Sequence, residues 1–306
     1  MRDRQSVRIA RLGFALALFT LLYGLSFAKK SGPRTEHGVL LNAPDTSAIA
    51  EITLTGPEGD SLSLETRGTP WRGRKGGIIF PLREDYATAL IGNARKPRSL
   101  TPISESPRAH AAYSLTEESA FRMDFFGPQG SPLSSLLVGR HDYTGRLLAA
   151  RSAGSDSSFY IDDDFSQSLS TESALWLDGR LFPSFAAPDA GAVQSLTLAS
   201  GTGGPVLHAP EGAYVQILGL RSSRLIDPDE AQARSSGPGS VLRLESANGA
   251  IASLRIFPIT GPSGPEYACV PSFIPLSPSK SGPESLRYGL VLSEWTYQRV
   301  LGLFSR

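Results

Sequence analysis

Few residues in this 306-residue sequence have the types and spacing that catalysis or metal binding needs. The histidines His37, His110, His141 and His208 each lack a second His or Cys within four residues, and Cys269 is the only cysteine. Metal and nucleophile sites usually gather several such side chains, and the HExxH, CxxC, GxSxG and phosphate-loop motifs are all absent. We therefore expect no catalytic residue, no metal ligand and no cofactor, and we predict that the chain is not an enzyme.

Two short runs concentrate charge. The aspartates at 162 to 164 carry the oxygen ligands that hard divalent cations prefer, but they lie between an expected strand and an expected helix, where Asp163 or Asp164 would cap the helix. Arg72, Arg74 and Lys75 in RGRKGG have the charge to contact an anionic headgroup or polymer. We interpret the acidic run as a helix cap and the basic run as a solvated turn.

A possible acid–base pair, His141 and Asp142, lies in GRHDYTGR. Neighbouring strand residues point to opposite faces of a sheet, so we interpret this pair as part of a polar turn. An enzyme acting on glycan or peptide through Asp142, Asp162 and Glu266 stays an alternative, and it would need a pocket with two carboxyl groups about 5 to 10 Å apart. Cys269 lies in the apolar run EYACVPSF, which predicts a buried structural thiol and excludes an intramolecular disulfide.

The charge balance excludes nucleic acid as a partner. Residues 1 to 30 hold six basic residues and one acidic residue, whereas the rest of the chain holds 24 basic and 28 acidic residues. A mildly acidic body without a basic stripe does not bind a phosphate backbone.

The opening stretch RIARLGFALALFTLLYGLSFAKK is apolar between basic flanks. Residues 12 to 28 are uncharged and would span roughly 25 Å as a helix, so with the snorkelling side chains of Arg11 and Lys29 they predict a transmembrane signal anchor. Basic residues precede the stretch, which predicts a cytoplasmic N-terminus and a periplasmic body. A cleaved signal peptide ending at Ala28 is the alternative. Either interpretation exports the body, and we expect a single-pass protein of the inner membrane.

Frequent Gly and Pro punctuate the rest of the chain, which favours many short strands. Alternating leucines and isoleucines predict a hairpin at 51–65, periodic apolar residues predict helices at 83–96 and 163–177, and four strand-like runs lie between them. A similar order returns over 192–304, with helices expected at 213–226 and 294–304. We predict an α+β fold of two similar halves, each built of antiparallel hairpins and one or two helices. The expected boundaries are 1–30 for the anchor, 31–47 for a tether, 48–190 for the first half and 191–306 for the second.

Six short phrases mark the middle of the chain, and they are Trp71 after a hairpin, Tyr113-Ser114-Leu115, Leu137-Val138-Gly139, Leu148 to Arg151, Tyr160-Ile161-Asp162 and Leu177 to Leu181. In these phrases the chain resembles, over about residues 48 to 200, the bacterial family called domain of unknown function 4340. Ser114 stands where the family has glycine, and the Arg-Asp order near 178–180 differs. The resemblance implies an exported, membrane-anchored protein encoded beside ABC transporters of the gliding-motility type, and it brings no catalytic residues.

Together these observations predict a membrane-anchored, extracytoplasmic and non-catalytic accessory or scaffold protein of an ABC transporter or a cell-envelope assembly. Its expected partners are the inner-membrane bilayer and a membrane protein such as a transporter subunit. Two alternatives remain open: an exported ligand-binding module with a cleft between its halves, and the carboxylate enzyme described above.

Overall fold

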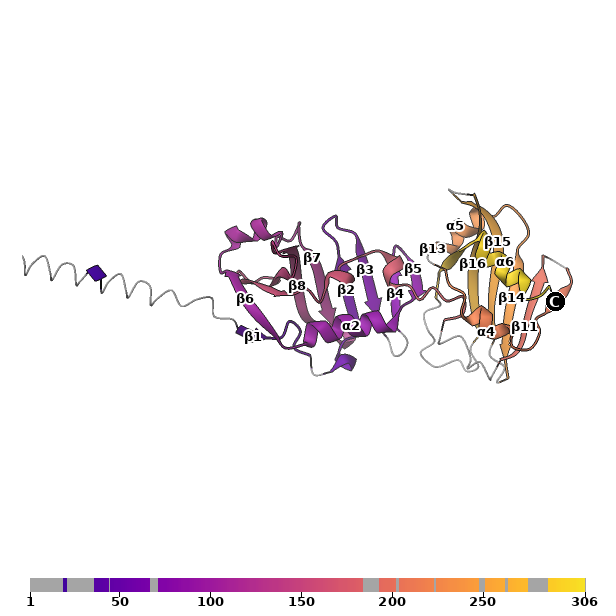
Figure 1. The fold of residues 1–306 in the computed structure, drawn as a ribbon, viewed down its shortest axis with the longest axis horizontal. Helices are drawn as coiled ribbons and strands as arrows, with labels where there is room; N and C mark the ends of the chain where they lie inside the picture. The colour runs from indigo at the N-terminus through magenta and orange to yellow at the C-terminus, as the bar shows by residue number, and fades with distance from the viewer. Residues whose placement is uncertain are drawn as a thin grey trace, which may run out of the picture.

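Two large antiparallel sheets lie end to end and form most of the molecule (Figure 1). This computed structural model describes residues 19–20, 36–43, 45–66, 71–183, 193–201, 204–222, 224–247, 251–261, 264–274 and 286–305. The predicted α+β class is wrong, because the described chain is mostly strand and its helices are short and few beside the two sheets.

The first sheet has ten strands, and alternating side chains explain its two faces. Ile52 and Leu54 on one strand and Leu62 and Leu64 on its hairpin partner are fully buried, while the polar residues between them point to the other face. The strand order is β1 (Glu36–Gly38), β6 (Arg98–Ser104), β10 (Ser158–Asp162), β9 (Leu147–Ser152), β8 (Pro132–His141), β7 (Phe121–Phe126), β2 (Glu51–Thr55), β3 (Ser61–Glu65), β4 (Arg72–Lys75) and β5 (Ile78–Pro81).

One helix of three turns covers the apolar face of this sheet. The helix α2 (Glu84–Arg95) buries Ala87, Leu90, Ile91 and Ala94, which recur at the three- and four-residue spacing of a single helical stripe. The sequence prediction of a helix here is confirmed.

The opposite face is covered by the segment that contains the 3₁₀ turns η2 (Pro107–Tyr113). Arg151 of β9 is buried beneath it and donates from Nε to the Leu115 carbonyl at 2.7 Å and from Nη2 to Glu117 at 3.0 Å. Gly139 leaves room for the segment, since a Cβ there would lie 2.1 Å from the Tyr113 carbonyl oxygen. Residues of the phrases near 113, 139 and 151 therefore meet in one packed cluster.

The second sheet has seven strands and is covered on both faces. Its helices are α4 (Ala213–Leu218) and α6 (Glu294–Gly302), which contribute Ile217 and Val300 to the main core, and α5 (Pro228–Ala233), which packs Ala231 onto a smaller cluster with Phe257. The strand order is β12 (Val206–His208), β11 (Val193–Ser200), β14 (Ser240–Ser246), β15 (Ile251–Gly261), β16 (Gly264–Ile274), β17 (Gly289–Ser293) and β13 (Arg224–Ile226).

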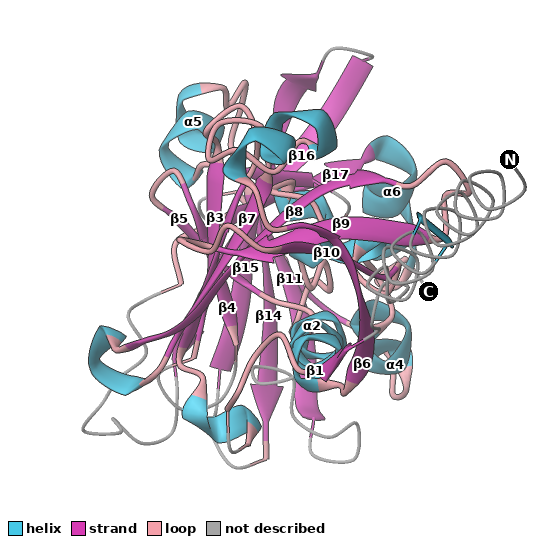
Figure 2. Cartoon of the chain, turned by 90° about the vertical axis from the view of Figure 1, so that its left-hand side faces the viewer, coloured by secondary structure: helices cyan, strands magenta, loops and turns pink. Residues whose placement is uncertain are grey.

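The two sheets share one order of strands. In the first sheet the order β3-β2-β7-β8-β9-β10-β6 corresponds element by element to β12-β11-β14-β15-β16-β17-β13 in the second. In both, the hairpin comes first in the chain, a helix follows, and the next strand joins the far edge of a four-stranded meander. Figure 2, which looks along the long axis, shows the two equivalent helices α2 and α4 on the same side of the strands. The first sheet adds β1 at one edge and the β4–β5 hairpin at the other.

Backbone contacts join the two sheets. Ile79 of β5 exchanges hydrogen bonds of 3.0 Å with Arg287 in both directions, and Ser222 donates to the Gly179 carbonyl at 2.7 Å. Buried residues of both sheets belong to one continuous apolar cluster, which includes Phe80, Trp176 and Tyr288.

The helix predicted at 163–177 is largely absent. In its place the structure has a 3₁₀ turn, η4 (Ser166–Ser168), and a four-residue helix, α3 (Ser173–Trp176). Serine and threonine hydroxyls in this run compete for backbone groups, as when Ser170 Oγ accepts from the Glu172 N–H at 3.0 Å. The apolar period alone therefore overestimated the helix content, which is one reason why the predicted fold class is wrong.

The predicted inner-membrane location also needs correction. Within the described part of the chain, no helix combines the length and the apolar character that crossing a bilayer requires. The segment on which the anchor was predicted lies outside the described residues, apart from Phe19 and Thr20. Part of the expected tether packs on the first sheet, where β1 pairs with β6 and Leu41 is buried.

Candidate functional site

The predicted candidate His141 meets an aspartate from the acidic run. His141 Nε2, at the end of β8, lies 3.0 Å from Asp163 Oδ2 and 3.1 Å from the Ser166 hydroxyl. Asp163 also accepts from the backbone N–H of Ser166 at 3.2 Å and from its hydroxyl. Hydrogen bonds from Ser166 and His141 outweigh the effect of burial, which acts in the opposite direction, and hold the pKa of Asp163 below its ordinary value.

This Ser–His–Asp group does not have the geometry of a nucleophilic triad. In a triad the histidine contacts serine through one ring nitrogen and aspartate through the other. Here Asp163 and Ser166 both contact Nε2, and the serine hydroxyl donates to the aspartate. These residues line neither of the two cavities of the described chain that are discussed below. The group is a polar cap on the turn that follows β10.

The other residues of the two charged runs are also held by local partners. Asp164 pairs with Lys96 at 3.2 Å and Arg98 at 3.6 Å. Of the basic run, Arg74 binds Glu65 at 2.7 Å, and Lys75 donates to the Thr171 carbonyl at 2.8 Å. No set of three metal-ligating side chains gathers within the described ranges.

The three carboxylates considered for an enzyme do not meet in one pocket. Asp142 accepts from the backbone N–H groups of Arg146 and Leu147 and closes the β8–β9 turn. Asp162 ends β10 of the same sheet, whereas Glu266 lies on β16 of the second sheet and pairs with Arg224. Cys269 is fully buried, and burial raises the pKa of its thiol.

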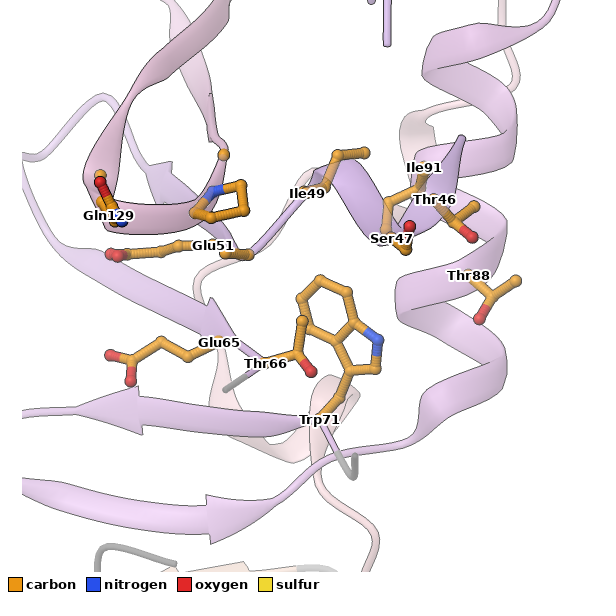
Figure 3. Close-up of a pocket in the computed structure, with 14 residues that line it drawn as sticks. Thr46, Ser47, Ile49, Glu51, Glu65, Thr66, Trp71, Thr88, Ile91 and Gln129 are labelled. Atoms are coloured by element: carbon orange, nitrogen blue, oxygen red, sulfur yellow. The ribbon is translucent and has the colours of Figure 1, made fainter. Parts of the chain in front are cut away.

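A cavity of about 1020 Å³ opens at one end of the first sheet (Figure 3). We call it the Trp71 pocket. It is bounded by the helix α2, the ends of β2 and β3, the 3₁₀ turn η1 (Thr46–Ala48) and the loop at 127–130. Its lining residues are Thr46, Ser47, Ile49, Ala50, Glu51, Glu65, Thr66, Trp71, Thr88, Ile91, Gly127, Pro128, Gln129 and Gly130.

Local hydrogen bonds position the walls of the Trp71 pocket. Asp45 caps η1 by accepting from the Ala48 N–H at 3.0 Å and from the Ser47 hydroxyl at 2.6 Å. The preceding chain is anchored to the end of α2 because the Leu41 N–H donates to the Ala94 carbonyl at 2.9 Å and Arg95 Nε donates to the Ala43 carbonyl at 3.1 Å. The wall opposite the sheet is therefore fixed before any ligand arrives.

The Trp71 indole points into the pocket, below η1 and on the strand side of α2 in Figure 3. Its backbone carbonyl accepts from the Leu82 N–H at 3.4 Å, which holds the start of the β4–β5 hairpin. The indole is only partly buried, and no hydrogen bond of its ring N–H is found with any residue that the structure describes. A partly exposed aromatic ring in a concavity is a common means of binding an apolar or cationic ligand group.

Glu51 and Glu65 form an acidic rim of the pocket. They are direct partners across the β2–β3 pair, and in Figure 3 their carboxylates point the same way, away from the indole. Arg74 holds Glu65 through Nε at 2.7 Å and Nη2 at 3.2 Å, which compensates for two like charges placed opposite each other. Glu51 accepts from the Thr53 hydroxyl at 3.3 Å.

Sequence reasoning did not find this pocket. Its residues come from five segments between 46 and 130, and only the fold brings them together. From the sequence, Trp71 was placed only after a hairpin, although an aromatic residue beside the polar RGRKGG run was the one available signal.

The predicted cleft between the halves has a small counterpart. A polar pocket of about 290 Å³ lies where the two sheets meet, lined by Leu82, Arg83, Glu84, Asp85, Asp178, Arg180 and Arg221. Its charges are largely paired, since Arg83 binds Asp85 at 3.1 Å and Arg180 binds Asp178 at 2.6 Å.

Comparison with known proteins finds no matching family model, and no curated protein or solved structure that matches this chain significantly. The resemblance to the domain of unknown function 4340 therefore stays a prediction.

Proposed function

We propose that this chain is a non-catalytic binding protein that holds a ligand in the Trp71 pocket. The observation that carries the proposal is a pocket of about 1020 Å³ that places a partly exposed indole beside aliphatic and hydroxyl side chains. Ligand pockets are typically concave, mainly apolar and fitted with a few polar groups, in the range of roughly 300 to 1,000 Å³.

The arrangement of the two carboxylates argues against an enzyme in this pocket. A glycosidase needs two carboxyl groups that flank the scissile bond, one of them able to donate a proton. Glu51 and Glu65 instead lie side by side on neighbouring strands and point in the same direction, and Glu65 is held in a two-point ion pair with Arg74. Binding is the function that such a site supports.

A thermal-shift screen tests this proposal. The panel contains amines, amino acids, organic acids and sugars, and each ligand-induced shift is measured against the same variant without ligand. We expect a bound compound to raise the Tm of the wild type by several degrees, because a ligand that binds only the folded state stabilises it.

Two variants assign the effect to the pocket. Trp71→Ala removes the indole, and Thr88→Phe fills the space from the exposed side of α2 without touching the core. Both should abolish the shift, whereas Trp295→Ala, an exposed tryptophan on α6, should leave it unchanged. If no compound shifts the wild type, or if the shift survives in both pocket variants, the proposal is wrong.

A further inference from the structure

The ionisable side chains that line the Trp71 pocket are both carboxylates. Glu51 and Glu65 belong to the lining, and no Lys, Arg or His of the described chain does. A phosphate, sulfate or carboxylate ligand would lose its hydration here without gaining a cationic partner. The lining therefore disfavours anions.

The two carboxylates differ in their partners. Arg74, which lies outside the lining, binds Glu65 through two nitrogens and balances its charge. Glu51 accepts a hydrogen bond from the Thr53 hydroxyl at 3.3 Å, and it has no cationic partner within the described part of the chain. Among the lining residues that the structure describes, one negative charge is therefore left for a ligand to balance.

The indole adds a second feature that attracts the same chemistry. The face of an indole attracts a cation electrostatically, and it also packs on the aliphatic or aromatic body that carries the cation. Trp71 and Glu51 line one cavity, with Ile49 and Ile91 as apolar walls. A ligand with an apolar body and one positive charge satisfies all of these groups together.

We propose that the Trp71 pocket binds ligands with a single ammonium or guanidinium group on an apolar body, and that Glu51 selects the charge. This inference rests on the proposed binding function and names the class of ligand. The positive group can belong to a free amine or to a lysine or arginine side chain of a protein segment, and both present the same chemistry to Glu51.

A charge series with a constant body tests this inference. The probes are 2-phenylethylamine, 2-phenylethanol and phenylacetate, which carry a positive, a zero and a negative charge, and binding is measured by calorimetry and by Trp71 fluorescence. Trp295, which is exposed on α6, is replaced by phenylalanine to lower the background, and the fully buried Trp176 remains as a constant contribution in every sample. We expect the amine to bind about fivefold to tenfold more tightly than the alcohol, and the acid more weakly than either.

Glu51→Gln should make the amine and the alcohol bind equally, while binding of the alcohol persists. Glu58→Gln is the matched control, since it removes one negative charge from the exposed turn of the same hairpin outside the pocket. This control should keep the preference for the amine, and added salt should weaken that preference in the wild type.

A second pair of probes distinguishes the two sources of the cation. N-acetyl-lysinamide and N-acetyl-norleucinamide differ by the ammonium group on a peptide-like body. A preference for the lysine compound over the norleucine compound assigns the site to a protein segment, and a preference confined to the free amine assigns it to a small molecule.

The outcomes separate this inference from the binding function itself. If the amine has no advantage, or if its advantage survives Glu51→Gln, the inference is overturned. If other compounds of the panel still raise the Tm of the wild type but not that of the pocket variants, the proposed binding function stands without this inference about ligand charge. If neither the series nor the panel binds, both proposals fail.

Discussion

Ser114 adopts the left-handed backbone conformation, with φ 56° and ψ 42°, where the η2 turns end. This conformation costs free energy for a residue that has a Cβ, whereas glycine adopts it without that steric cost. We predict that Ser114→Gly raises the free energy of unfolding by about 0.5 to 1 kcal/mol, measured by urea denaturation. Ser114→Ala keeps the Cβ and should show no gain, so a loss of stability in the glycine variant would contradict the strain.

Asp163 makes stability depend on pH. Its pKa is lowered in the folded protein by hydrogen bonds from Ser166 and His141, against the opposing effect of burial. Its stabilising effect is therefore complete above the ordinary carboxyl pKa of about 3.9 and disappears as the pH falls through the lower folded value.

We predict that Asp163→Asn is less stable than the wild type by about 0.5 to 1 kcal/mol at neutral pH, because a charged acceptor is lost. The difference should vanish in acid, where the wild-type carboxyl is protonated, and unfolding at a series of pH values measures this. An equal difference at every pH would show that the charge of Asp163 is not the cause. The control variant is Asp142→Asn, which removes a carboxylate from the β8–β9 turn that does not contact His141.

Individual residues were predictable from the sequence where one local rule decides their role. The burial of Cys269 follows from the adjacent sequence. The helix that Asp163 was expected to cap is largely absent, and Asp163 instead accepts from the Ser166 N–H in a tight turn. The contact between His141 and Asp163 joins residues 22 positions apart, and strand pairing creates it. Glu51 and Glu65 likewise come together only because β2 and β3 pair in a hairpin.

At the scale of elements, the β4–β5 hairpin depends on a glycine. Gly73 lies opposite Phe80, and a Cβ on Gly73 would come within 2.2 Å of the buried ring. We predict that Gly73→Ala lowers the free energy of unfolding by about 1 to 3 kcal/mol through overpacking. Gly92→Ala on the open side of α2 should instead stabilise the protein by about 0.5 to 1 kcal/mol, and thermal unfolding of both variants checks the contrast.

Elements with strong periodicity followed from the sequence. The β2–β3 hairpin and the helices α2 and α6 occupy the expected ranges. The helix expected at 213–226 ends at Leu218, and Arg224–Ile226 forms the edge strand β13. Arg224–Ile226 is a strand because it pairs with β17, and local sequence propensity does not predict such a long-range pairing.

At the scale of the whole molecule, the two sheets should unfold together. Their buried side chains form one apolar cluster, and Gly179 touches the second half so closely that a Cβ would lie 1.9 Å from the Ser222 carbonyl oxygen. We predict one calorimetric transition for the wild type, and a lower first transition that separates from the second for Gly179→Ala. Gly302→Ala, with open space around its Cβ position, is the control and should keep one transition.

The overall arrangement was less predictable than its parts. Alternating runs indicated hairpins, but the balance of helix and strand depended on whether serine-rich runs such as 166–171 would remain helical. The number of strands in each sheet depended on edge strands, such as β1 and β13, of three residues. Such short strands have too few residues for a pattern, and long-range pairing alone defines them.

The β4–β5 hairpin has no counterpart in the strand order of the second sheet, and it begins directly after Trp71. The same addition supplies Ile79, which bonds to Arg287 of the other half. A chain without this hairpin would lack the support that follows Trp71 and one of the contacts with the neighbouring sheet. Substitutions in this short piece of chain are therefore expected to affect both the ligand pocket and the joint between the halves.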